Sequence, residues 1–238
     1  MKGILLAAGK GVRLKPLTDT IPKPLIQIAK KPVLQRIIEG LESSGINDLA
    51  IVIGYLGYKI IDGFDTGAKH NVTLRYFHQT VMNGTARAVL PASGFIGNDP
   101  FFLGYGDILV DSEEYTRIVQ LHKQFPSDSI IAGYPSKTPW TGGVLKHQSH
   151  ILTDVIEKPE RGTEPGNLIN AGLMILQPEI IDHIRNVRPS PRGEYELTDA
   201  LKTLAAESVV RIHIINTFWS DIGTHQKLAE ANDHFSNR

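Results

Sequence analysis

Short apolar runs and longer amphipathic stretches alternate along the first half of the chain. The apolar runs are nearly continuous, which is typical of strands buried on both faces of a parallel sheet, and they cover residues 4–8, 49–53, 72–77 and 101–103. Residues 33–44 have the spacing of an amphipathic helix that ends at Gly45, and residues 85–92 and 112–125 are similar. Repeated strand–helix–strand order predicts right-handed βαβ units and an α/β fold with an open, mostly parallel sheet.

The pattern changes after about residue 127, where predicted strands follow one another closely. Turn residues at Gly142-Gly143 and Gln148-Ser149 separate the first three of these strands, which we place at residues 130–134, 144–147 and 151–156. The remaining predicted elements are a strand at 169–177, helices at 179–185 and 194–206, a final hairpin at 209–215 and 217–221, and a last helix at 224–235.

No internal repeat, low-complexity tract or flexible linker divides the sequence. We therefore expect one domain, residues 1–238, composed of two halves that meet near residue 126.

Composition and charge narrow the class of protein. The chain is 41% hydrophobic and 21% charged, and its 25 Lys and Arg balance 25 Asp and Glu, so no net charge draws it to nucleic acid or to an anionic membrane. The absence of cysteine excludes disulfides, thiolate metal sites and a cysteine nucleophile. The first apolar run is too short for a signal-peptide core, and no stretch approaches the roughly 20 apolar residues of a membrane helix. We expect a cytoplasmic protein without nucleic-acid or membrane partners.

A loop of small residues follows the first predicted strand. Its backbone amides can approach phosphates closely, and it comprises Leu6, Ala7, Ala8, Gly9 and Gly11. Arg13 adds a forked cation for phosphate oxygens, and Lys23, between two prolines, adds a second cation on a stiffened turn. A dinucleotide-binding fingerprint would need glycine where Leu14 stands, and a Walker A loop would need Gly-Lys-Ser/Thr, which the segment lacks. The loop indicates a phosphate site of another kind.

This loop is part of a longer pattern, in which Ala-Ala-Gly-x-Gly-x-Arg is followed by Pro-Leu-Thr and Pro-Lys-Pro-Leu. The pattern resembles the signature of sugar-1-phosphate nucleotidyltransferases, which include glucose-1-phosphate thymidylyl- and uridylyltransferases and mannose-1-phosphate guanylyltransferases. The resemblance continues in order along the chain through Gln79 with Gly84-Thr85-Ala86, Gly106-Asp107, Glu157-Lys158-Pro159, Asn170-Ala171-Gly172, the segment 193–199 and the segment 219–224.

The resemblance implies a fold, a reaction and a cofactor. The fold would be the three-layer, Rossmann-like nucleotidyltransferase fold of the glycosyltransferase-A type. A sugar-1-phosphate oxygen would attack the α-phosphorus of an NTP, giving an NDP-sugar and pyrophosphate, with Mg²⁺ as cofactor. Such chemistry needs alignment and charge neutralisation more than protein acid–base groups. Residues 1–126 would form the nucleotide-binding half and residues 127–238 the sugar-phosphate-binding half, and homo-oligomers are common in the group.

Two aspartates match the metal-binding positions of these enzymes. Asp107 follows a predicted strand, at the edge of an α/β sheet where ligands bind, and carboxylate oxygens suit Mg²⁺. The resemblance makes Asp221 the second carboxylate. The alternative for Asp107 is a helix N-cap, and for Asp221 a turn aspartate or an N-cap.

Three basic residues match phosphate-binding positions. Arg13 would bind the pyrophosphate portion and counter the charge developing on the leaving group. Lys23 would hold the incoming phosphate or the α-phosphate, so Arg13 and Lys23 form the predicted catalytic pair. Lys158 would neutralise the phosphate of the sugar. The alternative for each is an ordinary solvated surface cation.

Sugar and base would be read by polar groups in the matching segments. Glu157 and Asn170 would bond to sugar hydroxyls, with Gly172 in the same segment as Asn170. Gln79 could pair with a pyrimidine through one donor and one acceptor, beside the Gly84 backbone, which favours UTP or dTTP. Thr85 belongs to this nucleotide-binding segment, although Gly84-Thr85 could equally cap a helix.

The sequence departs from the group pattern at two positions, because Ile108 follows Asp107 where a polar residue is common and Tyr105 precedes Gly106. Some relatives carry a C-terminal repeat domain for acetyl transfer; this sequence ends at Arg238, so we expect no acetyltransferase activity. Two other functions stay open: transfer to a non-sugar phosphate such as phosphocholine, and a non-catalytic nucleotide-sugar sensor. A sensor would lack Arg13, Lys23 or one of the two aspartates, and all four are present.

Overall fold

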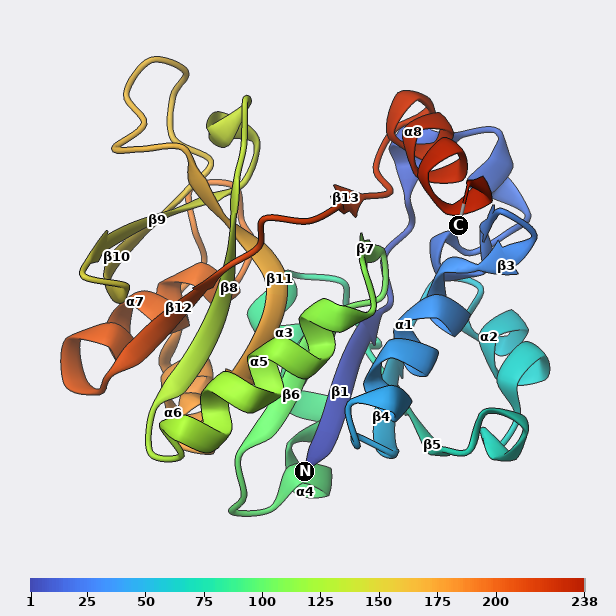
Figure 1. Cartoon of the computed structure of the whole chain (residues 1–238), viewed down its shortest axis with the longest axis horizontal. Helices are drawn as coiled ribbons and strands as arrows, with labels where there is room; N and C mark the ends of the chain where they lie inside the picture. The colour runs from blue at the N-terminus through green and yellow to red at the C-terminus, as the bar shows by residue number, and fades with distance from the viewer. Residues whose placement is uncertain (238) are drawn as a thin grey trace.

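The computed structural model describes residues 1–237, which are arranged around a nine-stranded sheet in the order β5-β4-β1-β6-β11-β8-β12-β10-β9 (Figure 1). The last residue of the predicted 1–238 domain, Arg238, lies outside the described residues. Among residues 1–237, no helix combines the length and apolar character needed to cross a membrane.

The first four main strands are parallel, as the apolar runs predict. They are β1 (Lys2–Ala7), β4 (Asp48–Ile53), β5 (Thr73–His78) and β6 (Phe101–Tyr105). The helices between them are α1 (Val33–Ser43), α2 (Gly57–Phe64), α3 (Thr85–Val89) and α4 (Ser93–Ile96). Two further short strands, β2 (Gln27–Ile28) and β3 (Lys31–Pro32), pair with each other in the long connection from β1 to α1.

Alternate side chains of the central strands enter two separate cores, one on each face of the sheet. Leu5 packs with α1, α5 (Glu113–Gln124) and α8 (His225–Ser236). Its neighbour Ile4 packs with α3, α4, α6 (Ile180–Asn186) and α7 (Leu197–Glu207). The sheet therefore lies between two helical layers, which confirms the predicted three-layer α/β fold.

The strands of the second half curl the sheet back on itself. They are β8 (Ser129–Pro135), β9 (Gly143–Gln148), β10 (Ile151–Glu157), β11 (Leu168–Leu176) and β12 (Val210–Ile214). Strand β11 runs antiparallel to both β6 and β8, and β12 is parallel to β8. Strand β9 pairs with β10 and also pairs with β11 through Val144 and Ile169. The strand at this edge of the sheet therefore contacts a strand from the middle of the sheet.

Two sequence predictions in this half need correction. The hairpin at 209–215 and 217–221 is wrong: β12 has β8 and β10 on its two edges, so the following segment finds no free edge there. Instead the chain crosses the molecule (Figure 1) and forms β13 (Trp219–Asp221), which pairs antiparallel with β7 (Ile108–Val110). The helix predicted from residue 194 begins at Leu197, because the backbone of Tyr195 bonds to Asn83 and Ala86 instead.

Candidate active site

A cleft of about 550 Å³ opens where the carboxyl ends of β1 and β6 meet β10, β11 and β13. All the predicted site residues line it except Gly172. Gly172 lies behind the wall, where a Cβ would stand 2.6 Å from the ring of Tyr105. The cleft has two ends, which we call the loop end (residues 6–13 and Lys23) and the β10 end (Glu157, Lys158 and Asn170).

At the loop end, the backbone after β1 is held by the neighbouring strands. The carbonyl of Leu6 accepts a hydrogen bond from the amide of Gly106 at 2.9 Å, and the carbonyl of Ala8 accepts one from Tyr55 at 3.1 Å. The buried hydroxyl of Thr18 donates to the carbonyl of Gly11 at 2.9 Å. Because parallel strands end at the same edge of a sheet, these bonds fix the loop with its small residues facing the cleft.

The two candidate metal ligands lie on paired neighbouring segments that both line the cleft. Asp221 is opposite Ile108 in the β7–β13 ladder, and the carbonyl of Asp107 accepts a hydrogen bond from Ile222 at 2.9 Å. Each carboxylate is paired with a lysine: Asp107 with Lys23, and Asp221 with Lys227. Lys23 is only 8% exposed. The β7–β13 pairing thus brings together two aspartates that are far apart in sequence.

This pair of carboxylates suits a hard divalent cation. Mg²⁺ in proteins is typically held by one or two carboxylates, with waters and substrate phosphates completing its shell. In the described residues 1–237, no group of three or more His, Asp or Glu is placed to hold a metal, so an all-protein cage is absent from that part of the chain. The donor set therefore fits Mg²⁺ bound jointly by protein and phosphate.

Arg13 reaches from the loop end toward the turn after β13. A Cβ placed on Gly223 would stand 2.8 Å from Nη2 of Arg13 and 3.4 Å from Oδ2 of Asp221. The guanidinium thus occupies the space beside Gly223, close to the aspartate pair. Both predicted catalytic cations, Arg13 and Lys23, line the cleft.

Gln79 and Gly84 form a small polar surface on the wall of the cleft. Gln79 is 9% exposed, and its Nε2 donates to the carbonyl of Gly84 at 3.3 Å. An amide has a second hydrogen and a carbonyl oxygen, so it can still donate to and accept from a base. Gly84 has φ of 123°, and a Cβ there would lie 2.3 Å from the carbonyl of Tyr195, so glycine alone fits. Thr85 accepts from the amide of Leu197 at 3.0 Å, which makes it a cap for α7.

The β10 end is built from side chains that hold one another. Glu157 accepts from Oγ1 of Thr198 at 3.1 Å and from Nη2 of Arg192 at 3.4 Å, and Nζ of Lys158 is 3.7 Å away. Oδ1 of Asn170 accepts from the amide of Gly172 at 2.9 Å. This bond leaves the Nδ2 group of Asn170 as its donor toward a ligand.

Tyr105 stands between the aspartate pair and the β10 end. Burial raises the pKa of its phenol first, and the negative charges of Glu157, Asp107 and Glu196 raise it further. The phenol therefore stays protonated at neutral pH, and its hydroxyl is hydrogen-bonded with the side chain of Thr85.

Sequence reasoning missed several polar residues of this site, namely Tyr105 as a wall residue, Arg192, Thr198 and Lys227. Arg192 and Thr198 flank or belong to the matched segment 193–199, so that segment was the available signal. Lys227 lies in the first turn of α8, and no pattern in the sequence indicates that it pairs with Asp221.

The chain is similar to known proteins along nearly its whole length. The "Nucleotidyl transferase" family model matches residues 2–238. The chain is 37% identical to the bifunctional protein GlmU of Methanococcus maripaludis, covering 100% of this chain and 55% of that protein. It is 33% identical to the low-salt glycan biosynthesis nucleotidyltransferase Agl11 of Haloferax volcanii, covering 98% and 65%. The chain thus spans between about half and two thirds of the length of these curated relatives.

Solved structures agree over the whole fold. A UDP-glucose pyrophosphorylase complexed with UDP-glucose superimposes with a TM-score of 0.90 at 27% identity, covering 100% of this chain and 99% of that one. A putative glucose-1-phosphate thymidylyltransferase from Bacillus anthracis gives 0.91 at 25% identity, covering 100% and 96%. The family match, the fold and the cleft agree, and the chain belongs to the nucleotidyl transferase family.

Proposed function

We propose that this chain transfers a nucleotidyl group from an NTP to a sugar-1-phosphate, forming an NDP-sugar and releasing pyrophosphate. The observation that carries the proposal is the β7–β13 pairing, which sets Asp107 and Asp221 side by side between the loop end and the β10 end. One end offers backbone amides and cations, which suit phosphates, and the other offers a carboxylate, an amide and a lysine, which suit a phosphorylated sugar.

In this reaction an oxygen of the sugar phosphate forms a bond to the α-phosphorus, and the bond from that phosphorus to the bridging oxygen of the pyrophosphate breaks. Arg13 at the loop end neutralises charge on the departing pyrophosphate. Lys23 exchanges its pairing with Asp107 for a phosphate oxygen of the nucleotide. Lys158 binds the phosphate of the sugar and orients the attacking oxygen.

Mg²⁺ is the proposed cofactor, with Asp107 and Asp221 as its ligands. When bound it would supply charge neutralisation at the phosphates and a template for their alignment. No acid–base residue is required, because phosphate oxygen is already ionised at neutral pH.

The proposed base is a pyrimidine that carries an N–H beside a carbonyl, as uracil and thymine do. Oε1 of Gln79 would accept from the ring N–H, and the backbone near Gly84 would meet an adjacent carbonyl. For the sugar, Glu157 would accept from one hydroxyl and Nδ2 of Asn170 would donate to another.

We assign nucleotide binding to residues 1–126 and sugar-phosphate binding to residues 127–238, joined in one catalytic unit. A cytoplasmic location, where NTPs are available, and assembly into a homo-oligomer complete the proposal.

The test measures pyrophosphate release in the presence of Mg²⁺, crossing the four ribo-NTPs and dTTP against a panel of sugar-1-phosphates and phosphocholine. We expect strong release with UTP or dTTP and one sugar-1-phosphate. Release only with phosphocholine would make the chain a transferase of a different alcohol phosphate. Nucleotide binding without release across the panel would support a sensor and contradict the proposed reaction.

A further inference from the structure

The segment that carries Asp221 to the cleft crosses between two parts of the molecule. Residues 215–218, which we call the crossing segment, link β12 to β13 (Figure 1). The amide of Ile215 still bonds to Gly133 beside β12, at 2.9 Å. Three residues after the crossing segment, Asp221 lies beside Asp107. The placement of Asp221 therefore depends on how this segment is anchored.

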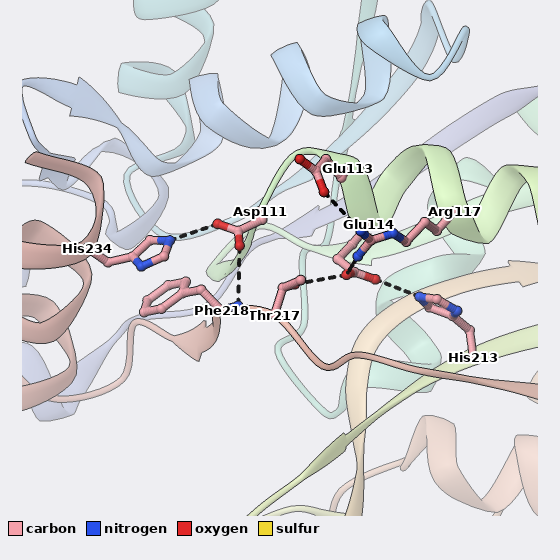
Figure 2. A network of polar contacts seen from close by, with 8 residues as sticks. All are labelled: Asp111, Glu113, Glu114, Arg117, His213, Thr217, Phe218 and His234. Carbon is pink, nitrogen blue, oxygen red and sulfur yellow. Dashed lines mark hydrogen bonds and ion pairs between the residues drawn. The ribbon is translucent and has the colours of Figure 1, made fainter. Parts of the chain in front are cut away.

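Two buried carboxylates, those of Glu114 and Asp111, face the crossing segment (Figure 2). Glu114, in the first turn of α5, is 1% exposed, and Asp111, just after β7, is 3% exposed. Oε1 of Glu114 accepts from Oγ1 of Thr217 at 2.9 Å, and Oδ2 of Asp111 accepts from the amide of Phe218 over a longer 3.4 Å.

The same carboxylates also bind elements on either side of the crossing segment. Oε2 of Glu114 lies 2.6 Å from Nε2 of His213 in β12, and Oδ1 of Asp111 lies 2.8 Å from Nε2 of His234 in α8. Because carboxylate oxygens accept, each histidine donates through Nε2. Phe218 stacks on His234, with ring centroids 4.1 Å apart. Glu114 and Asp111 thus tether the chain before, within and after the crossing segment.

The β7–β13 ladder cannot fix its own register strongly, because each strand has only three residues. A one-residue slip is opposed by burial: Ser220 is 4% exposed, so the slip would bury the charge of Asp221 in its place. A two-residue slip keeps every side chain on its own face and moves Asp221 about 6–7 Å along the strand. The alternation of buried and exposed side chains does not oppose a two-residue slip, whereas tethers at one end of β13 do oppose it.

The burial of Glu114 and Asp111 beside the crossing segment is explained if these residues select the register of β13. Carboxylates removed from water cost stability unless they are fully bonded, and well-packed apolar residues often serve stability equally well. The best-attested gain from buried charged groups is the selection of one register over another.

We propose that Glu114 and Asp111 are positioning residues that fix the register of β13 against β7 and so hold Asp221 beside Asp107. The inference rests on the proposed function, in which these two aspartates bind the divalent cation. Glu114 acts through Thr217 and His213 and does not touch the substrates or the metal.

The test compares Glu114→Gln and Thr217→Val with Glu113→Gln as matched control. Glu113 precedes Glu114 on the same helix and also pairs with Arg117, but it is exposed and does not touch the crossing segment. Mn²⁺ binding to each purified protein is measured by electron paramagnetic resonance, together with the Mg²⁺ dependence of pyrophosphate release and the melting temperature. Because Thr217→Val leaves both carboxylates in place, it decides the question if Glu114→Gln fails to fold.

We expect Glu114→Gln and Thr217→Val to raise the half-saturating Mn²⁺ and Mg²⁺ concentrations by about three- to tenfold, the range of one lost hydrogen bond. kcat at saturating metal should change less, and Glu113→Gln should match the wild type. If Glu114 and Thr217 have a purely structural role, the variants will have a lower melting temperature and an unchanged metal affinity in the folded protein. That result would overturn the inference and leave the proposed function standing. Absence of Mn²⁺ binding in the wild type would overturn the proposed metal site and the inference together.

Discussion

The loop end of the cleft is shaped by backbone hydrogen bonds at the ends of parallel strands, whereas the β10 end consists of side chains that hold one another. Leu6 and Ala8 are fixed through their carbonyls by Gly106 and Tyr55. At the other end, the carboxylate of Glu157 is held by side chains, those of Thr198 and Arg192 among them. The shape of the loop end therefore depends on the sheet, whereas the positions of the polar groups at the β10 end depend on individual side chains.

This difference matches what each end is proposed to recognise. Triphosphates are the same in every NTP, so a site made of backbone amides and cations can serve any of them. Sugars differ in the position of single hydroxyls, which side-chain donors and acceptors can distinguish. We therefore expect substitutions at the β10 end to change sugar use without changing nucleotide use. The following predictions test that separation, beginning with the largest effect.

Asp107→Asn should damage turnover with every substrate, because the aspartate pair serves both ends. We expect a fall in kcat of about 100- to 1,000-fold, consistent with several kcal/mol of metal-borne charge stabilisation. The measurement is pyrophosphate release at saturating substrates, with circular dichroism to confirm folding. Asp48→Asn, at an exposed pair with Arg75, is the control and should behave as wild type. A near-normal rate in Asp107→Asn would remove this residue from the metal site.

Gly223→Ala should act on the loop end, because its closest contact is with Arg13. The added Cβ would occupy a point 2.8 Å from Nη2 of Arg13, and the flexible arginine can move away at little cost to the fold. Loss of its charged contacts should reduce kcat/KM for the NTP by about ten- to a hundredfold, with a melting temperature near that of the wild type. Gly94→Ala has no atom within 4 Å of its new Cβ and is the matched control. Unchanged NTP kinetics in Gly223→Ala would show that the position of Arg13 beside Gly223 is not required for NTP use.

Lys158→Ala should act on the β10 end alone. We expect KM for the sugar-1-phosphate to rise about tenfold, since one charged contact to phosphate is lost, while KM for the NTP stays the same. Steady-state kinetics with each substrate varied in turn measure both values. Lys146→Ala, on the exposed side of β9, supplies the comparison. A change confined to the NTP would mean that Lys158 binds the nucleotide.

Thr198→Val should give the smallest effect, because it removes one hydrogen bond to Glu157 and keeps the shape of the side chain. KM for the sugar-1-phosphate should rise by about threefold to fivefold, and Thr198→Ser should restore it. The readout is the KM for several sugar-1-phosphates. A raised KM in Thr198→Ser together with an unchanged KM in Thr198→Val would show that the methyl group and its packing matter, and not the hydrogen bond.

Local patterns in the sequence predict much of the first half and the residues of the cleft. The buried strands are continuous apolar runs, α1 has an unbroken apolar face, and the loop after β1 is recognisable from its small residues. Helix α2 was not predicted, because it has only eight residues, two of them glycine. Strand β7 was not predicted either, because three residues carry too little pattern.

The remaining features depend on contacts between distant segments. Strand β13 pairs with β7 and not with β12, since both edges of β12 are occupied, and that occupancy is a property of the whole sheet. The partners of the site residues, such as Lys227 for Asp221, follow from that pairing. The sequence resemblance indicated which residues enter the cleft, whereas only the fold shows how they are held.

The most direct test of the proposed transfer follows the phosphates of UTP or dTTP labelled separately at the α and γ positions. The protein is incubated with each labelled nucleotide and Mg²⁺, with and without the active sugar-1-phosphate, and the products are separated. We predict that α-label moves into the NDP-sugar and γ-label into pyrophosphate, and that both depend on the sugar-1-phosphate. Transfer of γ-label to the sugar, or formation of α-labelled NMP without any NDP-sugar, would contradict nucleotidyl transfer as the reaction of this chain.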